Sequence, residues 1–159
     1  MNSNKTEQTV VITDTSCLII LDKLGRLSVL HQLFSNVLTT PEIAAEYGQN
    51  LPEWIVVLSV RNKSLHEQFL MMTDPGEASA IALAHEIDNQ FLITDDLEAR
   101  KVALKVGLSV IGTIGVLIRA KAAGHIDLLK PLIDQMRQTN FRISDELYKT
   151  ALFQAGEQS

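Results

Sequence analysis

Short apolar runs alternate with longer amphipathic segments along the whole chain. Val10-Val11-Ile12-Thr13 is the first run, and its β-branched residues are typical of a strand buried on both faces of a sheet. Similar runs predict further strands at residues 37–40, 54–60, 91–94 and 108–111. Between the runs, apolar residues recur every three or four positions, which is the spacing of a helix packed against a core. The alternation predicts an α/β protein, with helices covering both faces of a parallel sheet.

Capping residues, prolines and glycines indicate where the predicted helices begin and end. Thr40-Pro41-Glu42 and Asp74-Pro75-Gly76-Glu77 each place a capping residue before a proline in the first helical turn. The predicted helices are 16–23, 27–34, one starting at Pro41, 62–72, one opening at Asp74, one that ends at Gly107, 113–123, 127–137 and 144–153. Asp74 with Glu77 forms a pair of the capping-box type, which explains Glu77 without any chemical role.

Composition limits the class of protein. The 159 residues suit one domain with its core between about residues 10 and 152. No apolar run reaches the roughly 18 residues of a membrane helix, and Met1–Thr9 lacks the apolar centre of a signal peptide. Cys17 is the only cysteine, so a disulfide framework is excluded and a buried, inert thiol is expected. We expect a cytoplasmic protein that does not enter the membrane.

A net charge of −5 argues against nucleic-acid binding by bulk electrostatic attraction. The distribution of basic residues weakens this argument, because nine of the fourteen Lys and Arg residues lie between Arg100 and Lys149. Many acids, by contrast, stand at predicted strand ends and helix starts. A bound divalent cation would invert the negative field of such a cluster.

Acidic residues follow two predicted strands directly. Asp14 ends the first, and Asp95 and Asp96 follow residues 91–94. Carboxyl ends of parallel strands share one edge of a sheet with the starts of the following helices, where Glu46 and Glu77 belong. Carboxylates that converge there repel one another unless they are protonated or bridged by a cation. Oxygen ligands suit Mg²⁺ or Mn²⁺, and the matching chemistry is phosphodiester hydrolysis.

Each acid also has a simpler interpretation. Asp14 has the residue type of a helix N-cap, and Glu42 and Glu46 fit a solvated helix face. We favour Asp14 and Glu46 as ligands, place Glu42 in solvent and leave Glu77 open. The four histidines fall in or at the ends of predicted helices, so none is placed as a catalytic base. They are His31, His66, His85 and His125.

Several motifs occur in a familiar order. They are Asp14-Thr15-Ser16, Pro41 with Glu46, Asp74-Pro75-Gly76-Glu77-Ala78 leading into Ala80-Ile81-Ala82-Leu83-Ala84, Thr94-Asp95-Asp96, Gly112-Thr113-Ile114-Gly115-Val116-Leu117 and Phe141-Arg142-Ile143-Ser144-Asp145. Together they resemble the PIN-domain nucleases, and most closely a prokaryotic branch related to VapC-type toxins. The resemblance runs from Val10 to about Leu152.

The resemblance implies a three-layer α/β/α sandwich around a parallel five-stranded sheet, with Mg²⁺- or Mn²⁺-dependent ribonuclease activity. Its acidic quartet corresponds to Asp14, Glu46, Glu77 and one of Asp95 and Asp96. The third acid is commonly Asp in the toxins, so Glu77 departs from the pattern. The spacing from Glu77 favours Asp95, whereas the threonine-any-aspartate motif favours Asp96, which we prefer. Candidate substrate contacts flank the acids: Thr15, Ser16, Thr94, Arg100 and Lys101.

The resemblance also implies RNA as substrate, a homodimer and, in many operons, a small antitoxin protein. Apolar residues beyond the needs of one small core point to the same dimer: Leu65, Phe69, Met71 and Met72. Three hypotheses follow: a metal-dependent endoribonuclease that is the toxin of a toxin–antitoxin pair, a catalytically silent PIN-like module that binds RNA or protein, and a phospho-acceptor receiver domain. The receiver is disfavoured because it needs an acidic pair after the first strand, where Asp14 stands alone.

Overall fold

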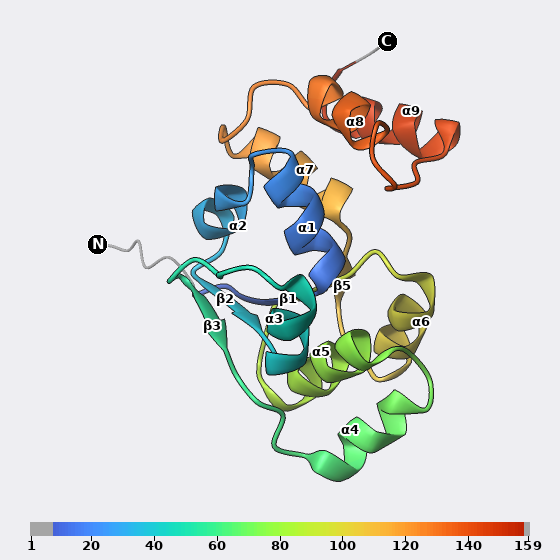
Figure 1. Cartoon of the computed structure of the whole chain (residues 1–159). Helices are drawn as coiled ribbons and strands as arrows, with labels where there is room; N and C mark the ends of the chain where they lie inside the picture. Colours follow the sequence, from blue (N-terminus) through green and yellow to red (C-terminus); the bar gives the residue numbers. More distant parts are fainter. Residues whose placement is uncertain (1–7, 158–159) are drawn as a thin grey trace, which may run out of the picture.

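Five parallel strands form one sheet in the computed structural model, which describes residues 8–157 (Figure 1). The strands are β1 (Val10–Thr13), β2 (Asn36–Thr39), β3 (Ile55–Val57), β4 (Phe91–Ile93) and β5 (Val110–Ile111). They lie in the order β3-β2-β1-β4-β5, with Ile12 opposite Leu38 on one side and Leu92 on the other. The expected parallel five-stranded sheet is confirmed, and β1 lies at its centre.

Helices cover the sheet on both faces, as the alternating pattern predicted. The helices are α1 (Thr15–Lys23), α2 (Ser28–Leu33), α3 (Pro41–Tyr47), α4 (Lys63–Leu70), α5 (Pro75–Glu86), α6 (Leu97–Lys105), α7 (Thr113–Ala122), α8 (Lys130–Met136) and α9 (Asp145–Gln154). Figure 1 shows α1, α2 and α7 above the sheet and α4, α5 and α6 below it. The architecture is therefore the expected α/β/α sandwich.

The α5 helix packs on the central strands through small side chains. Its alanines are buried, and it contacts both β1 and β4. Val11, Ile12, Leu92 and Ile93 of those strands have no exposed surface. Removing such aliphatic side chains from water supplies the main stabilising free energy of a core like this. This packing holds the ends of β1 and β4 in fixed positions.

Several predicted elements are shorter in the structure than expected, and two of them lose four residues each. The strand predicted at 54–60 is only Ile55–Val57, because β2 ends at Thr39 and leaves residues beyond Leu58 without a strand partner. The helix predicted at 127–137 begins at Lys130, and Pro131 occupies its first turn. Both errors are at element ends, where local periodicity is least informative.

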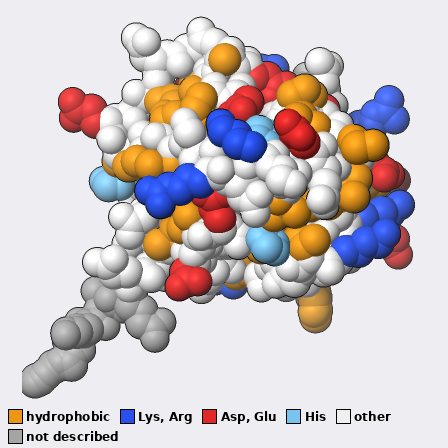
Figure 2. Space-filling model, turned by 90° about the horizontal axis from the view of Figure 1, so that it is seen from below, with side chains coloured by type: hydrophobic (Ala, Val, Ile, Leu, Met, Phe, Trp, Pro, Cys, Tyr) orange, Lys and Arg blue, Asp and Glu red, His pale blue; other side chains and the backbone are white. Residues whose placement is uncertain are grey.

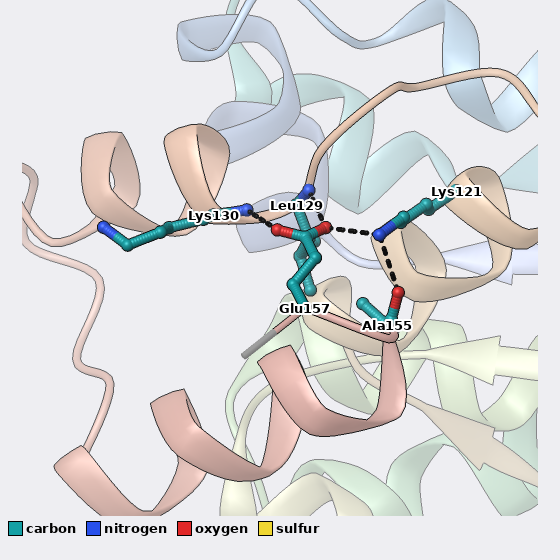
Figure 3. Close-up of polar contacts among 5 residues, drawn as sticks. All are labelled: Lys121, Leu129, Lys130, Ala155 and Glu157. Atoms are coloured by element: carbon teal, nitrogen blue, oxygen red, sulfur yellow. Dashed lines mark hydrogen bonds and ion pairs between the residues drawn. The ribbon is translucent and has the colours of Figure 1, made fainter. Parts of the chain in front are cut away.

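The C-terminal end of the described chain ties α7, α8 and α9 together (Figure 3). One carboxylate oxygen of Glu157 accepts hydrogen bonds from Leu129 N and, at 2.8 Å, from Lys121 Nζ. The other accepts from Lys130 N at 3.0 Å, and Lys121 Nζ also donates to the carbonyl of Ala155 at 2.6 Å. Glu157 thus caps the start of α8, which has no capping side chain of its own there.

The exposure of individual apolar side chains corrects part of the argument for a dimer. Phe69 is only 2% exposed and belongs to the core, so it is wrong as a dimer contact, and Leu65 is half-buried against that core. Met71, by contrast, is 88% exposed, and Met72 is exposed as well. On the face seen in Figure 2, charged side chains of both signs are interspersed with hydrophobic ones.

No helix within residues 8–157 is long and apolar enough to cross a membrane. Most of the polar segment Met1–Thr9 lies outside the described residues.

Candidate functional site

The ends of the two central strands bring acidic residues together at one edge of the sheet. Asp14 directly follows β1 and its N–H donates to Ile93 O of β4 at 3.1 Å, one residue before Thr94. On the other side, Thr39 Oγ1 of β2 donates to Thr13 O at 3.0 Å. The acids that follow β1 and β4 therefore start from adjacent, hydrogen-bonded positions.

Asp14 is both a helix cap and a candidate ligand. Its side chain is 1% exposed, and Oδ1 accepts a hydrogen bond from Cys17 N at 2.9 Å, which caps α1. Oδ2 is buried and has no hydrogen-bond partner among the described residues. Burial, and then the charge of Asp95, raise the pKa of Asp14 to about 6, against the lowering effect of the Cys17 N–H. Capping uses one oxygen and leaves the other, buried oxygen for a proton shared with the neighbouring Glu77 carboxyl or for a cation.

Glu77 points toward β4 and does not close a capping box. Its backbone N donates to Asp74 Oδ1 at 2.9 Å, as the sequence predicted. Its carboxylate, however, is in a residue only 7% exposed and accepts a hydrogen bond from Thr94 Oγ1 at 3.0 Å. Burial, and then the charge of Asp14, raise the pKa of Glu77 to about 9. Glu77 is therefore largely protonated at pH 7 unless a cation binds beside it.

Asp74, Glu77 and Asp96 form a cluster of three acidic residues. Each offers a carboxylate oxygen, and these oxygens lie within 4.8 Å of one another. Asp74 was assigned only as the N-cap of α5 from the sequence, so its place in this cluster was missed. A usable signal was its position at the start of a helix that already carried the candidate Glu77.

Glu46 reaches the same edge from α3. Its Oε1 accepts a hydrogen bond from Thr15 Oγ1 at 2.5 Å. Gly76 makes this approach possible, because a Cβ at that position would lie 2.5 Å from Glu46 Oε1 and 3.7 Å from Asp74 Oδ1. Glu42 and Glu46 are both exposed, but only Glu46 has a hydrogen bond to a residue at this edge.

Asp95 and Asp96 have different environments. Asp95 uses both oxygens on Thr113, accepting from the backbone N at 2.9 Å and from Oγ1 at 2.5 Å. Burial raises the pKa of Asp95, while the Thr113 hydrogen bonds and the Arg100 charge lower it in part. Asp96 caps α6 through Oδ1, which accepts from Ala99 N at 2.8 Å. The geometry therefore places Asp96 in the three-acid cluster, whereas both oxygens of Asp95 are engaged by Thr113.

Some of the residues predicted to contact the substrate are buried or already hydrogen-bonded within the protein. Thr15 and Thr94 are buried and donate their hydroxyl hydrogens to Glu46 and Glu77. Arg100 is half-buried and donates to Thr94 O at 3.1 Å. Ser16 is exposed, as is Lys101, whose Nζ lies 3.7 Å from the carboxylate of Glu98. The threonines therefore orient the acids.

The donor set fits a divalent cation. All ligand candidates are carboxylate oxygens, which hard cations such as Mg²⁺ and Mn²⁺ prefer. Glu77 of the cluster carries a carboxyl that binds a proton at neutral pH, and the neighbouring Asp14 keeps a buried oxygen that no N–H or hydroxyl group of the described residues satisfies. Removing one proton and adding a cation would relieve both energetic penalties.

Comparison with known proteins agrees with the fold. A family model described as a PIN domain matches residues 10–157, which is nearly the whole chain. No curated protein matches the chain.

Proposed function

Because the chain belongs to the PIN-domain family, we propose that it is a metal-dependent endoribonuclease that hydrolyses phosphodiester bonds of RNA. The observation that carries this proposal is the convergence of Asp74, Glu77 and Asp96 beside the buried, unpartnered Oδ2 of Asp14. A fold that served only as a scaffold would not need to bury an acceptor and keep a glutamate protonated at that edge.

Asp14, Glu77 and Asp96 would hold Mg²⁺ or Mn²⁺, with Asp74 and Glu46 next to them. A divalent cation at such a site activates a water molecule and neutralises charge on the phosphate. The chain contributes orientation: Thr94 positions the carboxylate of Glu77, and Thr15 positions that of Glu46. Because Glu77 is protonated at neutral pH without metal, binding at Glu77 requires its proton to leave.

A biological role can also be proposed for this nuclease. We propose that the protein is the toxin of a toxin–antitoxin pair and works as a homodimer, on the basis of the motifs shared with the VapC-related branch. The exposed Met71 and Met72 support a surface that contacts another chain. A gene for a small antitoxin beside this one would support the assignment, and its absence from related genomes would argue against it.

The test replaces Asp14 by Asn, which keeps the cap but removes a charge and the preferred ligand. We expect the Asp14→Asn protein to lose RNA cleavage and most of the rise in melting temperature that Mn²⁺ produces in wild type. Asp22→Asn is the matched control, because Asp22 is an exposed residue of α1. An Asp14→Asn protein that cleaves mixed RNA as fast as wild type would refute the catalytic role of this strand end. A wild type that neither binds Mn²⁺ nor cleaves RNA would instead favour the silent RNA- or protein-binding module.

A further inference from the structure

A cleft of about 710 Å³ is lined by residues of α6, α7 and α9 and by the edge strand β5. Asp95 is one of the lining residues, and Asp96, the next residue along the chain, belongs to the acidic cluster. Its volume lies within the range of sites that hold small organic groups. Nothing in the proposed chemistry at Asp14 and Glu77 uses this space.

The walls of the cleft combine apolar surface with two guanidinium groups. Ile111, Ile118 and Leu147 supply aliphatic surface, and Phe141 supplies an aromatic ring. Asp95 and Arg100 pack closely against Gly112, because a Cβ at Gly112 would lie 2.7 Å from Asp95 Oδ1 and 3.2 Å from Arg100 Nη1.

The two arginines differ in how they are held. Arg100 is anchored by its hydrogen bond to Thr94 O, at the end of β4. Arg142 lines the cleft as an exposed residue in the segment before α9. The charged side chains that line the cleft are these two arginines and Asp95, so the lining is net positive although the protein has a net charge of −5.

We propose that this cleft receives one unstacked base of a single-stranded nucleic acid, while Arg142 contacts the phosphate backbone of that strand. The inference deepens the proposed function and rests on it, since the strand would be the one that the acidic cluster cuts. An apolar slot suits the flat face of any base, and the guanidinium suits the phosphate that accompanies it. A base in a duplex is stacked and paired, so the cleft selects single strands or loops.

Thr150→Trp tests the proposal by filling the cleft from α9. Thr150 is exposed and lines the cleft, so an indole there occupies space without touching Asp14 or Glu77. The probe is a short fluorescein-labelled RNA strand of mixed sequence, and its binding is followed by anisotropy at low salt in EDTA. We expect Thr150→Trp to weaken binding at least about fivefold, the loss of one stacked base. A second strand with abasic central nucleotides should bind wild type more weakly and show little further loss with Thr150→Trp.

Arg142→Glu gives an independent variant, and Arg26→Glu is its matched control with the same charge change at an exposed position on the α1–α2 turn. We expect Arg142→Glu to weaken binding of both strands, and Arg26→Glu to weaken binding far less. Unchanged binding by Thr150→Trp, or equal losses on intact and abasic strands, would overturn the proposal.

Cleavage of the same RNA in Mn²⁺ separates this inference from the proposed function. A wild type that binds base-dependently but does not cut refutes the nuclease assignment and keeps the base site. A wild type that cuts, together with a Thr150→Trp variant that binds and cuts normally, refutes the base site alone.

Discussion

Glu77→Gln gives the most direct measure of the strain in the acidic cluster. Glutamine has the shape of the protonated side chain and keeps an acceptor for Thr94 Oγ1. The raised pKa of about 9 means that the metal-free folded protein holds a proton on Glu77 at pH 7, whereas the unfolded chain, at about 4.5, does not. Taking up that proton about 2.5 pH units above the unfolded pKa costs about 3 kcal/mol, at roughly 1.4 kcal/mol for each unit.

The sign of the pH dependence follows from the same shift. Between about pH 9 and 4.5 the folded state binds more protons than the unfolded state, so lowering the pH stabilises the fold. From pH 7 to pH 5 the free energy of unfolding of wild type should rise by about 3 kcal/mol through Glu77. Asp14 adds a smaller rise below about pH 6, its own pKa.

Urea unfolding of metal-free protein at pH 7 and pH 5 measures both quantities. We expect Glu77→Gln to be up to about 3 kcal/mol more stable than wild type at pH 7, and to lack most of the rise at pH 5. Melting temperatures should move by about 2–4 °C for each kcal/mol. Added Mn²⁺ should stabilise wild type more than Glu77→Gln, because the variant lacks a carboxylate ligand, and the stability advantage of the variant should therefore shrink or reverse. Glu67→Gln, at an exposed position on α4, is the control and should match wild type throughout. A Glu77→Gln protein no more stable than wild type at pH 7, or equally sensitive to pH, would show that the carboxyl is not buried against Asp14 as described.

Three further predictions concern other parts of the fold. Gly112→Ala should lower the free energy of unfolding by about 1–3 kcal/mol and reduce RNA cleavage, because the added Cβ would lie 2.7 Å from Asp95 Oδ1. Urea unfolding and an RNA cleavage assay measure the two effects. A variant as stable and as active as wild type would contradict the close approach of Asp95 to Gly112. Glu157→Gln should destabilise by about 1–2 kcal/mol at pH 7. Although burial alone raises the pKa of Glu157, hydrogen bonds from Lys121 and backbone N–H groups lower it, so the wild-type advantage should vanish in denaturation curves as the pH falls below its ordinary value of 4.5. Light scattering at roughly tens of micromolar should show a homodimer that Met71→Glu weakens, and a wild-type monomer would remove the dimer proposal.

Local patterns in the sequence determined the class of fold and much of the carboxylate edge. Val10–Thr13 is a strand because β-branched residues there pack on both faces, and Asp14 must then follow its carboxyl end. Thr40 and Asp74 cap α3 and α5 as their residue types predict, since capping depends on contacts within three residues. Properties that depend on near neighbours in the chain can be predicted in this way.

Tertiary structure alone decided how the acids divide their roles. Asp95 and Asp96 are adjacent in sequence, yet Thr113 engages the first and the three-acid cluster includes the second. The direction of the Glu77 carboxylate depends on Thr94, which lies 17 residues away on another element. Phe69 likewise fills the core although its helix also ends among exposed methionines. These outcomes depend on which elements pack together, because a contact between distant residues forms only after the whole sheet and its helices close on one core.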